Sequence, residues 1–319
     1  MSQLSDSSPV LILGGNGYLG SHLVEELLGL GCPVRILSRR RTGLLPQSLL
    51  KSPLLQYVLG DLSDLSACRE ALEGCSAVIH CIGPDLPSAS NHNPALDWHQ
   101  HVEPTLPFLR LLRDEPAIRF LFISSGGTVY GPNCVLPTPE GATCQPISAY
   151  GVHKLAIEKF LFLEHYLFGL DYIIARIANP YGGRQRTQSL QGAPTVFSYK
   201  VLKGEPIDLW GNGSVRRDFI HISDATDALI RMLKYKGNSR IFNIGTSRSL
   251  SMIALIEKIE TLTGRKAVIN WLPQRPFDVA ASELNIDLAS AELDWCPKVQ
   301  LDEGLMISIE RFDQLENGQ

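Results

Sequence analysis

The sequence lacks a hydrophobic run long enough to cross a bilayer, because its most apolar stretch, residues 160–177, is interrupted by charged residues such as Glu164 and Arg176. It also lacks a basic start followed by an apolar signal core, since residues 1–9 are rich in serine. Positive charge is not in excess, because 29 Lys and Arg stand against 33 Asp and Glu, for a formal charge of -4. We therefore expect no secretory signal, no membrane partner and no nucleic-acid partner.

The patterns of cysteine and histidine argue against a disulfide framework and against a zinc site. The seven cysteines are odd in number and contain no CxxC pair, which favours a reducing, cytoplasmic location over a disulfide framework. The eight histidines match no zinc signature; His92, His99 and His101 lie close in sequence but have no thiolate near them. We expect no metal site.

Short apolar runs alternate with helix-length segments through the first half of the chain. Most runs are continuously apolar, which is typical of strands in a parallel sheet covered on both faces. The pattern predicts an α/β fold with a doubly wound parallel sheet of the Rossmann type. The predicted strands are residues 10–13, 34–37, 56–59, 77–81, 120–124 and 172–177, and the predicted helices are residues 18–30, 65–72, 95–112 and 149–168.

After Asn179 the pattern changes to shorter strands mixed with helices. We predict a second, smaller mixed α/β lobe, some of whose segments return to the first domain. The predicted boundaries are a flexible N-terminus at residues 1–9, a first domain at 10–180 and the second lobe, mainly, at 181–319. The predicted strands here are residues 207–210, 219–222, 241–244 and 268–271, and the helices are 196–202, 225–235, 252–263 and 302–314.

A glycine-rich turn joins the first predicted strand to the first predicted helix. Gly14 permits the tight turn, Gly17 lets the backbone approach a pyrophosphate, and Gly20 allows close packing of helix on strand. The helix N-terminus then favours the anion. The spacing G-x-x-G-x-x-G in this position predicts that residues 10–180 bind a dinucleotide. The predicted contacts are Gly14, Asn16, Gly17, Tyr18, Leu19 and Gly20.

The end of the second strand bears on the choice of dinucleotide. An acidic residue there would bind the adenosine ribose, but the sequence has Ser38 followed by Arg39, Arg40 and Arg41. Serine and arginine suit a 2′-phosphate, so NADP is favoured over NAD. The alternative is a solvated basic loop beside NAD.

Gly60-Asp61-Leu62 follows the third strand, where Asp61 and Leu62 are predicted near the adenine. Asp61 could instead cap the next helix.

Tyr150 and Lys154 carry the clearest chemistry. Four residues apart on one helix, they share a face, and an ammonium together with a cationic nicotinamide would lower the pKa of the phenol toward neutrality. The phenol would then act as general base for a sugar hydroxyl. A hydroxyl from the Ser-rich segment 124–131 would complete a hydrogen-bonded triad with the substrate.

Taken in order, these motifs resemble the extended short-chain dehydrogenase/reductase family, specifically its NAD(P)-dependent nucleotide-sugar epimerases and dehydratases, such as the UDP-glucose 4-epimerases. The resemblance extends from about Val10 to Leu305. It is carried by GGNGYLG, GDL, SSGGTVYG, YGVHK, and the segments 176–182, 217–224, 242–245 and 275–278.

The resemblance implies a role for several residues. Tyr150 would be the catalytic base, and Lys154 would lower its pKa and hold the nicotinamide ribose. Cys81 and Gly83 would lie in the cofactor site. In the second lobe, which would bind the nucleotide sugar, Asn179 would contact the substrate diphosphate. Phosphates and ribose of the nucleotide would be held by Arg217, Arg275 and Asp278.

For two of these segments the residues leave another interpretation open. Arg217 and Asp218 could form a surface ion pair, and Asp224 is better explained as a helix cap than as a ligand contact.

The chain departs from the family pattern at three places. Gly126 stands where many members have a catalytic Ser or Thr, so the hydroxyl must come from Ser125, which we favour, from Thr128 or from water. Gly127 and Thr128 replace the acids of eliminating and decarboxylating members, which argues against those activities. His101 begins a His-Val-Glu-Pro segment where Asn-Val-x-Gly is usual.

The function that fits best is epimerisation at C4 of a nucleotide-diphosphate hexose, through a transient 4-keto sugar with the hydride held on NAD(P). One alternative is an NADPH-dependent nucleotide-sugar ketoreductase. An alternative from another class is a non-catalytic dinucleotide-binding sensor or scaffold. The helices predicted at residues 95–112 and 149–168 resemble those that pair in family homodimers, although one chain could bury both.

Overall fold

The computed structural model describes residues 8–41, 43–83, 87–186 and 192–316, so most of the predicted flexible N-terminus lies outside the described residues. By its internal contacts the chain divides into two units, which are described separately. The first unit comprises residues 1–125, 148–176 and 226–242, and the second comprises residues 126–147, 177–225 and 243–319.

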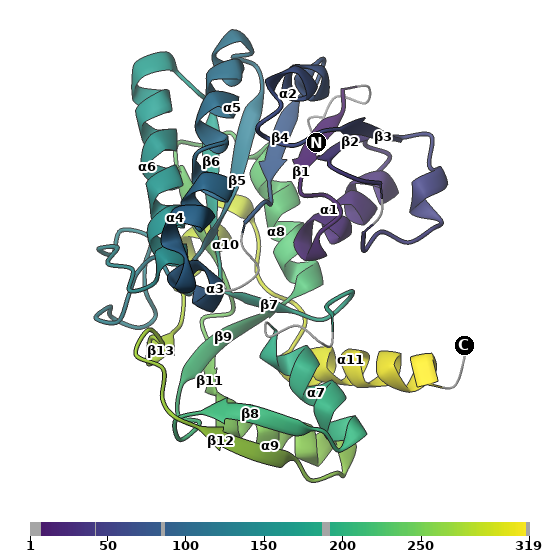
Figure 1. Ribbon diagram of the computed structural model, residues 1–319, viewed down its shortest axis with the longest axis vertical. Helices are drawn as coiled ribbons and strands as arrows, with labels where there is room; N and C mark the ends of the chain where they lie inside the picture. Colours follow the sequence, from purple (N-terminus) through teal and green to yellow (C-terminus); the bar gives the residue numbers. More distant parts are fainter. Residues whose placement is uncertain (1–7, 42, 84–86, 187–191, 317–319) are drawn as a thin grey trace. The chain divides into compact units, whose positions relative to one another are not determined.

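A seven-stranded sheet forms the centre of the first unit, in the order β10-β6-β5-β4-β1-β2-β3 (Figure 1). β1 pairs in parallel with β2 and β4, and these pair in parallel with β3 and β5. The predicted doubly wound parallel sheet is therefore confirmed. The strands are β1 (Val10–Leu13), β2 (Val34–Ser38), β3 (Leu55–Leu59), β4 (Ala77–His80), β5 (Arg119–Ser125), β6 (Tyr172–Ile177) and β10 (Ile241–Ile244).

Helices cover both faces of this sheet. On one face α2 packs on α5 and α5 packs on α6, over strand side chains such as Leu11, Phe120 and Phe122. The alternate residues, such as Ile12 and Ile79, are also fully buried. Burial on both faces explains why the strands are continuously apolar. The helices are α1 (Tyr18–Gly29), α2 (Leu65–Leu72), α5 (Thr105–Leu111) and α6 (Ala149–Phe168).

The single helix predicted at residues 95–112 is wrong. The chain forms α4 (Pro94–Asp97), a π-helical turn η2 (Trp98–Val102), α5 and a 3-10 turn η3 (Leu112–Asp114), after a helix α3 (Pro87–His92) that was not predicted. Pro104 explains the break, because a proline has no backbone N–H to donate and its ring disturbs the preceding helical turn. In η2 the bond from the Glu103 N–H to the Trp98 carbonyl, at 3.0 Å, spans five residues instead of four.

The second unit has smaller sheets and its own core. β9 pairs antiparallel with β11 and parallel with β7 and β13, while β8 pairs in parallel with β12. α7, α9 and α11 pack together around buried residues such as Tyr181, Ile207 and Ile256. The elements are β7 (Asn179–Tyr181), α7 (Ala193–Lys203), β8 (Pro206–Trp210), β9 (Arg216–His221), β11 (Ser249–Ser251), α9 (Met252–Thr263), β12 (Val268–Leu272), β13 (Ala281–Ser282), α10 (Asp287–Leu293) and α11 (Leu301–Glu316).

One helix, α8 (Ile222–Lys234), begins in the second unit and continues in the first. Across the described ranges, none of the helices combines the length and apolar character needed to cross a bilayer.

Candidate active site

The glycine-rich turn between β1 and α1 has the tight geometry that the sequence predicts. Gly14 has φ +83, a backbone conformation that favours glycine. A side chain at Gly20 would bring its Cβ within 2.3 Å of the Gly14 carbonyl oxygen. Gly17 precedes α1 and no side chain caps the helix there, while Tyr18 and Leu19 form its first turn. The turn therefore presents the N-terminus of α1 at the carboxyl end of β1, where an anion is favoured.

Asn16 ties this turn to the ends of β2 and β3. Its Nδ2 donates to the Ser38 Oγ at 3.0 Å and to the Arg40 carbonyl at 2.7 Å, and its Oδ1 accepts from the Tyr57 hydroxyl at 3.0 Å. Arg39, Arg40 and Arg41 are exposed, and the Arg41 guanidinium lies 5.9 Å from the centre of the Tyr57 ring. The Ser38 hydroxyl is thus used within the loop, and the three exposed arginines follow it at the end of β2, where the ribose contact is predicted.

The two residues predicted near the adenine, Asp61 and Leu62, follow β3 and differ in exposure. Asp61 is exposed, and its Oδ1 accepts from the Ser63 N–H at 2.9 Å. The suggestion that it caps the next helix is wrong, because Asp64 caps α2 through bonds to the Ser66 and Ala67 N–H groups. Leu62 is buried in the core, so its side chain is not available to a ligand.

Tyr150 and Lys154 lie in the first two turns of α6, which Ser148 caps by accepting from the Gly151 N–H at 3.2 Å. The Lys154 Nζ donates to the Ile123 carbonyl at 2.8 Å and lies 5.9 Å from the centre of the Tyr150 ring. Burial lowers the pKa of the Lys154 ammonium to about 8. The backbone of β5 therefore holds the ammonium next to the phenol.

The pKa of Tyr150 is raised to about 12, first by burial and further by the charge of Asp97, while a hydrogen bond with Ser125 lowers it. Within the chain alone, burial therefore works against the predicted lowering of the Tyr150 pKa. The hydrogen bond with Ser125 opposes this effect of burial. A phenol in this environment needs a further positive charge beside it to act as a base near neutral pH.

Ser125 and Thr128, the two side chains predicted as alternative sources of the catalytic hydroxyl, lie in different parts of the fold. The structure brings Ser125, the last residue of β5, to the phenol of Tyr150. Thr128 lies in the turn that follows β5 and belongs to the second unit.

The first unit fits a nicotinamide dinucleotide. A Cβ at Gly14 would lie 3.3 Å from the backbone of Cys81, and one at Gly83 would lie 3.0 Å from the Lys154 Nζ, so glycine keeps space open at both places. Burial raises the pKa of the Cys81 thiol to about 12, so the thiol stays uncharged at neutral pH. The helix N-terminus suits the pyrophosphate and Lys154 suits a ribose hydroxyl. For metals, no cluster of His, Cys, Asp or Glu suited to an ion occurs among the described residues.

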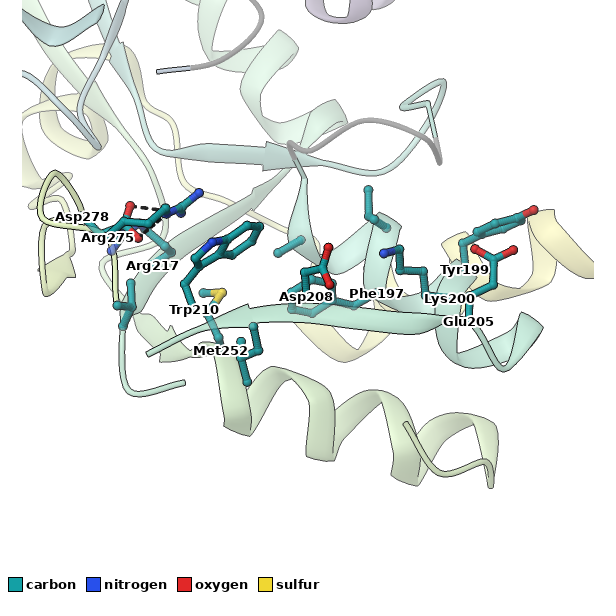
Figure 2. Close-up of a pocket in the computed structure, with 14 residues that line it drawn as sticks. Phe197, Tyr199, Lys200, Glu205, Asp208, Trp210, Arg217, Met252, Arg275 and Asp278 are labelled. Carbon is teal, nitrogen blue, oxygen red and sulfur yellow. Dashed lines mark hydrogen bonds and ion pairs between the residues drawn. The ribbon is translucent and has the colours of Figure 1, made fainter. Parts of the chain in front are cut away.

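The second unit contains a pocket of about 310 Å³. Figure 2 shows Arg217, Arg275 and Asp278 at one end of it, Lys200 and Glu205 at the other, and Trp210 on the wall between them. The predicted residues Arg217, Arg275 and Asp278 are thus brought together. Asn179 is not part of the pocket wall; it lies on β7, where its Nδ2 donates to the Asp218 carbonyl at 3.0 Å.

The cationic end of the pocket is held in a fixed geometry. Arg275 makes a bidentate pair with Asp278, at 2.8 and 3.1 Å, and its guanidinium lies 4.2 Å from the centre of the Trp210 ring. Arg217 donates to the Val279 carbonyl at 2.6 Å and lies 3.9 Å from Asp278. Two guanidinium groups beside one carboxylate leave a net positive charge, which suits a diphosphate.

Asp218 and Asp224 have structural partners. Asp218 is buried and accepts from the N–H and hydroxyl of Thr246, which excludes a surface ion pair with Arg217. Asp224 lies inside the first turn of α8 and accepts from the Val299 N–H at 2.9 Å, so the helix-cap interpretation is wrong.

Two wall residues of the pocket, Asp208 and Trp210, were not predicted. They alternate in β8 with Ile207 and Leu209, which are buried. This alternation is visible in the sequence and indicates that Asp208 and Trp210 share one face of a half-buried strand.

Comparisons with known proteins cover nearly the whole chain. The profile of the NAD dependent epimerase/dehydratase family matches residues 10–245. A dTDP-4-dehydro-6-deoxyglucose reductase of Escherichia coli is 34% identical over 305 residues, which cover 93% of this chain and 95% of that protein. The crystal structure of a UDP-glucose 4-epimerase of Thermotoga maritima with UDP-glucose has a TM-score of 0.89 at 30% identity, covering 97% of this chain and 99% of that one. The UDP-glucose 4-epimerase of Thermus thermophilus in complex with NAD has a TM-score of 0.86 at 27% identity, covering 96% and 99%.

Proposed function

Because the chain belongs to the NAD-dependent epimerase/dehydratase family, we propose that it is a nucleotide-sugar epimerase that inverts C4 of a nucleotide-diphosphate hexose. The observation that carries this proposal is the arrangement on α6, where a partly buried Tyr150 contacts Ser125 and lies beside Lys154. A base of this kind serves hydride chemistry at a hydroxyl-bearing carbon. The acids that elimination would need are absent at Gly127 and Thr128.

Tyr150 takes the proton of the C4 hydroxyl, and Ser125 stabilises the phenolate by its hydrogen bond. Lys154, held by the Ile123 carbonyl, adds positive charge near the phenolate and binds the nicotinamide ribose. A bound nicotinamide dinucleotide would supply the hydride acceptor and donor that inversion at C4 requires. Tyr150 then gives its proton back to the C4 oxygen.

The pocket of the second unit would bind the nucleotide. Arg217 and Arg275 would hold the diphosphate, and Asp278 would accept from the ribose hydroxyls. The ring of Trp210, already covered by Arg275 on one side, offers an apolar wall to the base or ribose. Asn179 would contact the diphosphate from β7. The UDP-glucose bound by the Thermotoga maritima relative supports a nucleotide sugar as substrate.

For the dinucleotide, we favour NADP over NAD. The exposed Arg39, Arg40 and Arg41 follow β2 at the position where an NAD enzyme needs an acidic residue. The Thermus thermophilus relative binds NAD, which supports the opposite choice and the redox-neutral cycle.

The second candidate function is a nucleotide-sugar ketoreductase. The Escherichia coli relative, a dTDP-4-dehydro-6-deoxyglucose reductase, and the three arginines favour it. The same Tyr150 would then donate its proton to the keto oxygen while NADPH is consumed.

A homodimer through α6 is also proposed. Five large side chains on its C-terminal half are between 43% and 76% exposed, and the rings of two of them stack at 6.2 Å. Such a patch on a helix suits a second copy of the chain. The residues are Phe162, Leu163, Tyr166, Leu167 and Phe168.

The test of the proposed function is direct. The purified chain is incubated with UDP-glucose and with other nucleotide hexoses, plus NAD or NADP, and the sugar is identified by NMR while dinucleotide reduction is followed by absorbance. An epimerase produces the C4 epimer with no net reduction. In a second incubation with a nucleotide 4-keto sugar and NADPH, consumption of NADPH identifies the reductase. Dinucleotide binding without turnover of any sugar in either incubation identifies a sensor or scaffold.

A further inference from the structure

A buried carboxylate lies between two imidazoles beside the tyrosine–lysine pair. The Asp97 Oδ2 is 2.5 Å from the His153 Nδ1, and its Oδ1 is 3.5 Å from the His101 Nε2. The side chains of Asp97 and His153 are 7% and 9% exposed. The edge of the Trp98 ring packs against the His153 ring, with centroids 5.6 Å apart. The carboxylate is therefore fixed in place and shielded from water.

This cluster faces the catalytic part of α6. Tyr150, His153 and Lys154 lie within one turn of the helix, at positions i, i+3 and i+4. Asp97 is the last residue of α4, and both α4 and the π-helical turn η2 pack on α6. Burial lowers the pKa of Lys154, and the negative groups that raise it are Cys81, when ionised, Asp97 and Glu158. The charge of Asp97 also raises the pKa of Tyr150, in addition to burial.

The Lys154 ammonium is buried without a contacting acid. Its hydrogen bonds go to the backbone carbonyls of Ile123 and Ile82, at 2.8 and 3.4 Å, and it lies 4.9 Å from the centre of the Phe122 ring. In the part of the chain that the structure describes, Lys154 forms no ion pair. A buried ammonium needs a negative charge nearby to stay protonated.

Glu158, one turn further along α6, also raises the pKa of Lys154, but its carboxylate is paired with a guanidinium. Its two oxygens accept from the Arg176 guanidinium at 3.1 and 2.6 Å, and the Ser124 hydroxyl donates to it at 2.5 Å. Its charge is offset by that of Arg176, and both side chains are 3% exposed.

His80 in β4 and Cys81 directly after it interact electrostatically with Lys154 and are uncharged at neutral pH. Burial raises the pKa of the Cys81 thiol to about 12 and lowers that of His80 to about 3. The imidazole of His101 can donate to Asp97 while it remains neutral. Asp97 is thus the one carboxylate near Lys154 whose charge no guanidinium offsets, among the contacts that the described residues make.

We propose that Asp97, held by His153 and His101, is the counter-ion of Lys154 and acts as a positioning residue that sets the pH range in which the Tyr150–Lys154 pair works. The proposal rests on the roles given above to Tyr150 and Lys154. The Asp97 carboxylate favours the protonated forms of Tyr150 and Lys154, so its removal lowers the pH at which each of them loses its proton.

The first test is the pH profile of kcat/KM. Asp97→Asn moves both limbs of the profile toward lower pH by about one unit, the effect of one charge at several ångströms in a protein interior. His153→Leu moves them in the same direction, because a buried carboxylate that keeps only the 3.5 Å contact with His101 takes up a proton more readily. His153→Gln keeps an N–H donor for Asp97 and restores the wild-type profile.

His99→Gln is the matched control, since His99 lies on the same turn η2 but is 71% exposed and pairs with Glu103. Its profile stays at the wild-type position. A loss of kcat/KM of equal size at every pH in Asp97→Asn, with no displacement of the limbs, shows a merely structural role and overturns the proposal.

The second test needs neither sugar nor dinucleotide. The Lys154 ammonium is titrated in the full chain by NMR of its ε-carbon, and the signal is assigned by its loss in Lys154→Met. Asp97→Asn lowers the titration midpoint of Lys154 by about one unit. An unchanged midpoint overturns the proposal. If Asp97→Asn does not fold, His153→Leu gives the same measurement, and a lowered midpoint in a chain that turns over no sugar refutes the proposed function while the counter-ion role stands.

Discussion

Replacing Ser125 by alanine removes the one group whose hydrogen bond favours the Tyr150 phenolate against burial. A hydrogen bond to a charged group contributes about 1.5–3 kcal/mol. Because one pKa unit corresponds to about 1.4 kcal/mol, its loss raises the pKa of the phenol by about one to two units. The phenolate fraction at fixed pH then falls about 10- to 100-fold, although the remaining phenolate is a stronger base.

We therefore expect kcat of Ser125→Ala to fall about 5- to 50-fold at neutral pH, with KM nearly unchanged. The low-pH limb of the kcat profile moves to higher pH, because more alkaline solution is needed to ionise the phenol. Thr128→Val is the matched control and keeps the wild-type profile. Stopped-time assays of sugar epimerisation across pH measure both variants, and equal small effects on kcat, with no displaced limb in Ser125→Ala, would refute the role given to Ser125.

Four other substitutions have definite expected results. Tyr150→Phe lowers turnover at least about 100-fold while dinucleotide binding, measured by calorimetry, is retained, and near wild-type turnover would exclude Tyr150 as the base. Arg39→Ala reduces the preference for NADP over NAD by about 10- to 100-fold in the same titrations, whereas an unchanged ratio means that the arginines only form a solvated loop. Glu158→Gln breaks a buried ion pair and lowers the free energy of unfolding by about 3–5 kcal/mol in urea. By contrast, Asp302 forms an exposed ion pair with Lys258, so Asp302→Asn changes the free energy of unfolding by about 1 kcal/mol or less.

Features set by local sequence were predicted well. The strand at residues 10–13 and the helices at residues 65–72 and 149–168 have the predicted bounds, because apolar run length and helix caps are local signals. The family membership inferred from the ordered motifs, starting with the glycine-rich turn, is confirmed.

Features that depend on irregular backbone or distant contacts were not predicted. Apolar periodicity continues through residues 95–112, but Pro104 ends the helix and a π-helical turn precedes it, so a periodic pattern alone gave one helix. Asp97 and His153 are 56 residues apart, and nothing in either segment indicates that they meet. The pKa of Tyr150 depends on burial, which motif spacing does not report.

The central claim is that the chain inverts C4 by removing and returning one hydride while Tyr150 holds the proton. The most direct test is incubation with UDP-glucose that carries deuterium at C4, with catalytic dinucleotide in ordinary water, followed by NMR of the product. We expect UDP-galactose that keeps its deuterium at C4, with no net change in dinucleotide redox state, and no product from Tyr150→Phe. A product that has lost the C4 deuterium to solvent, or that forms only with stoichiometric consumption of NADPH, would contradict it.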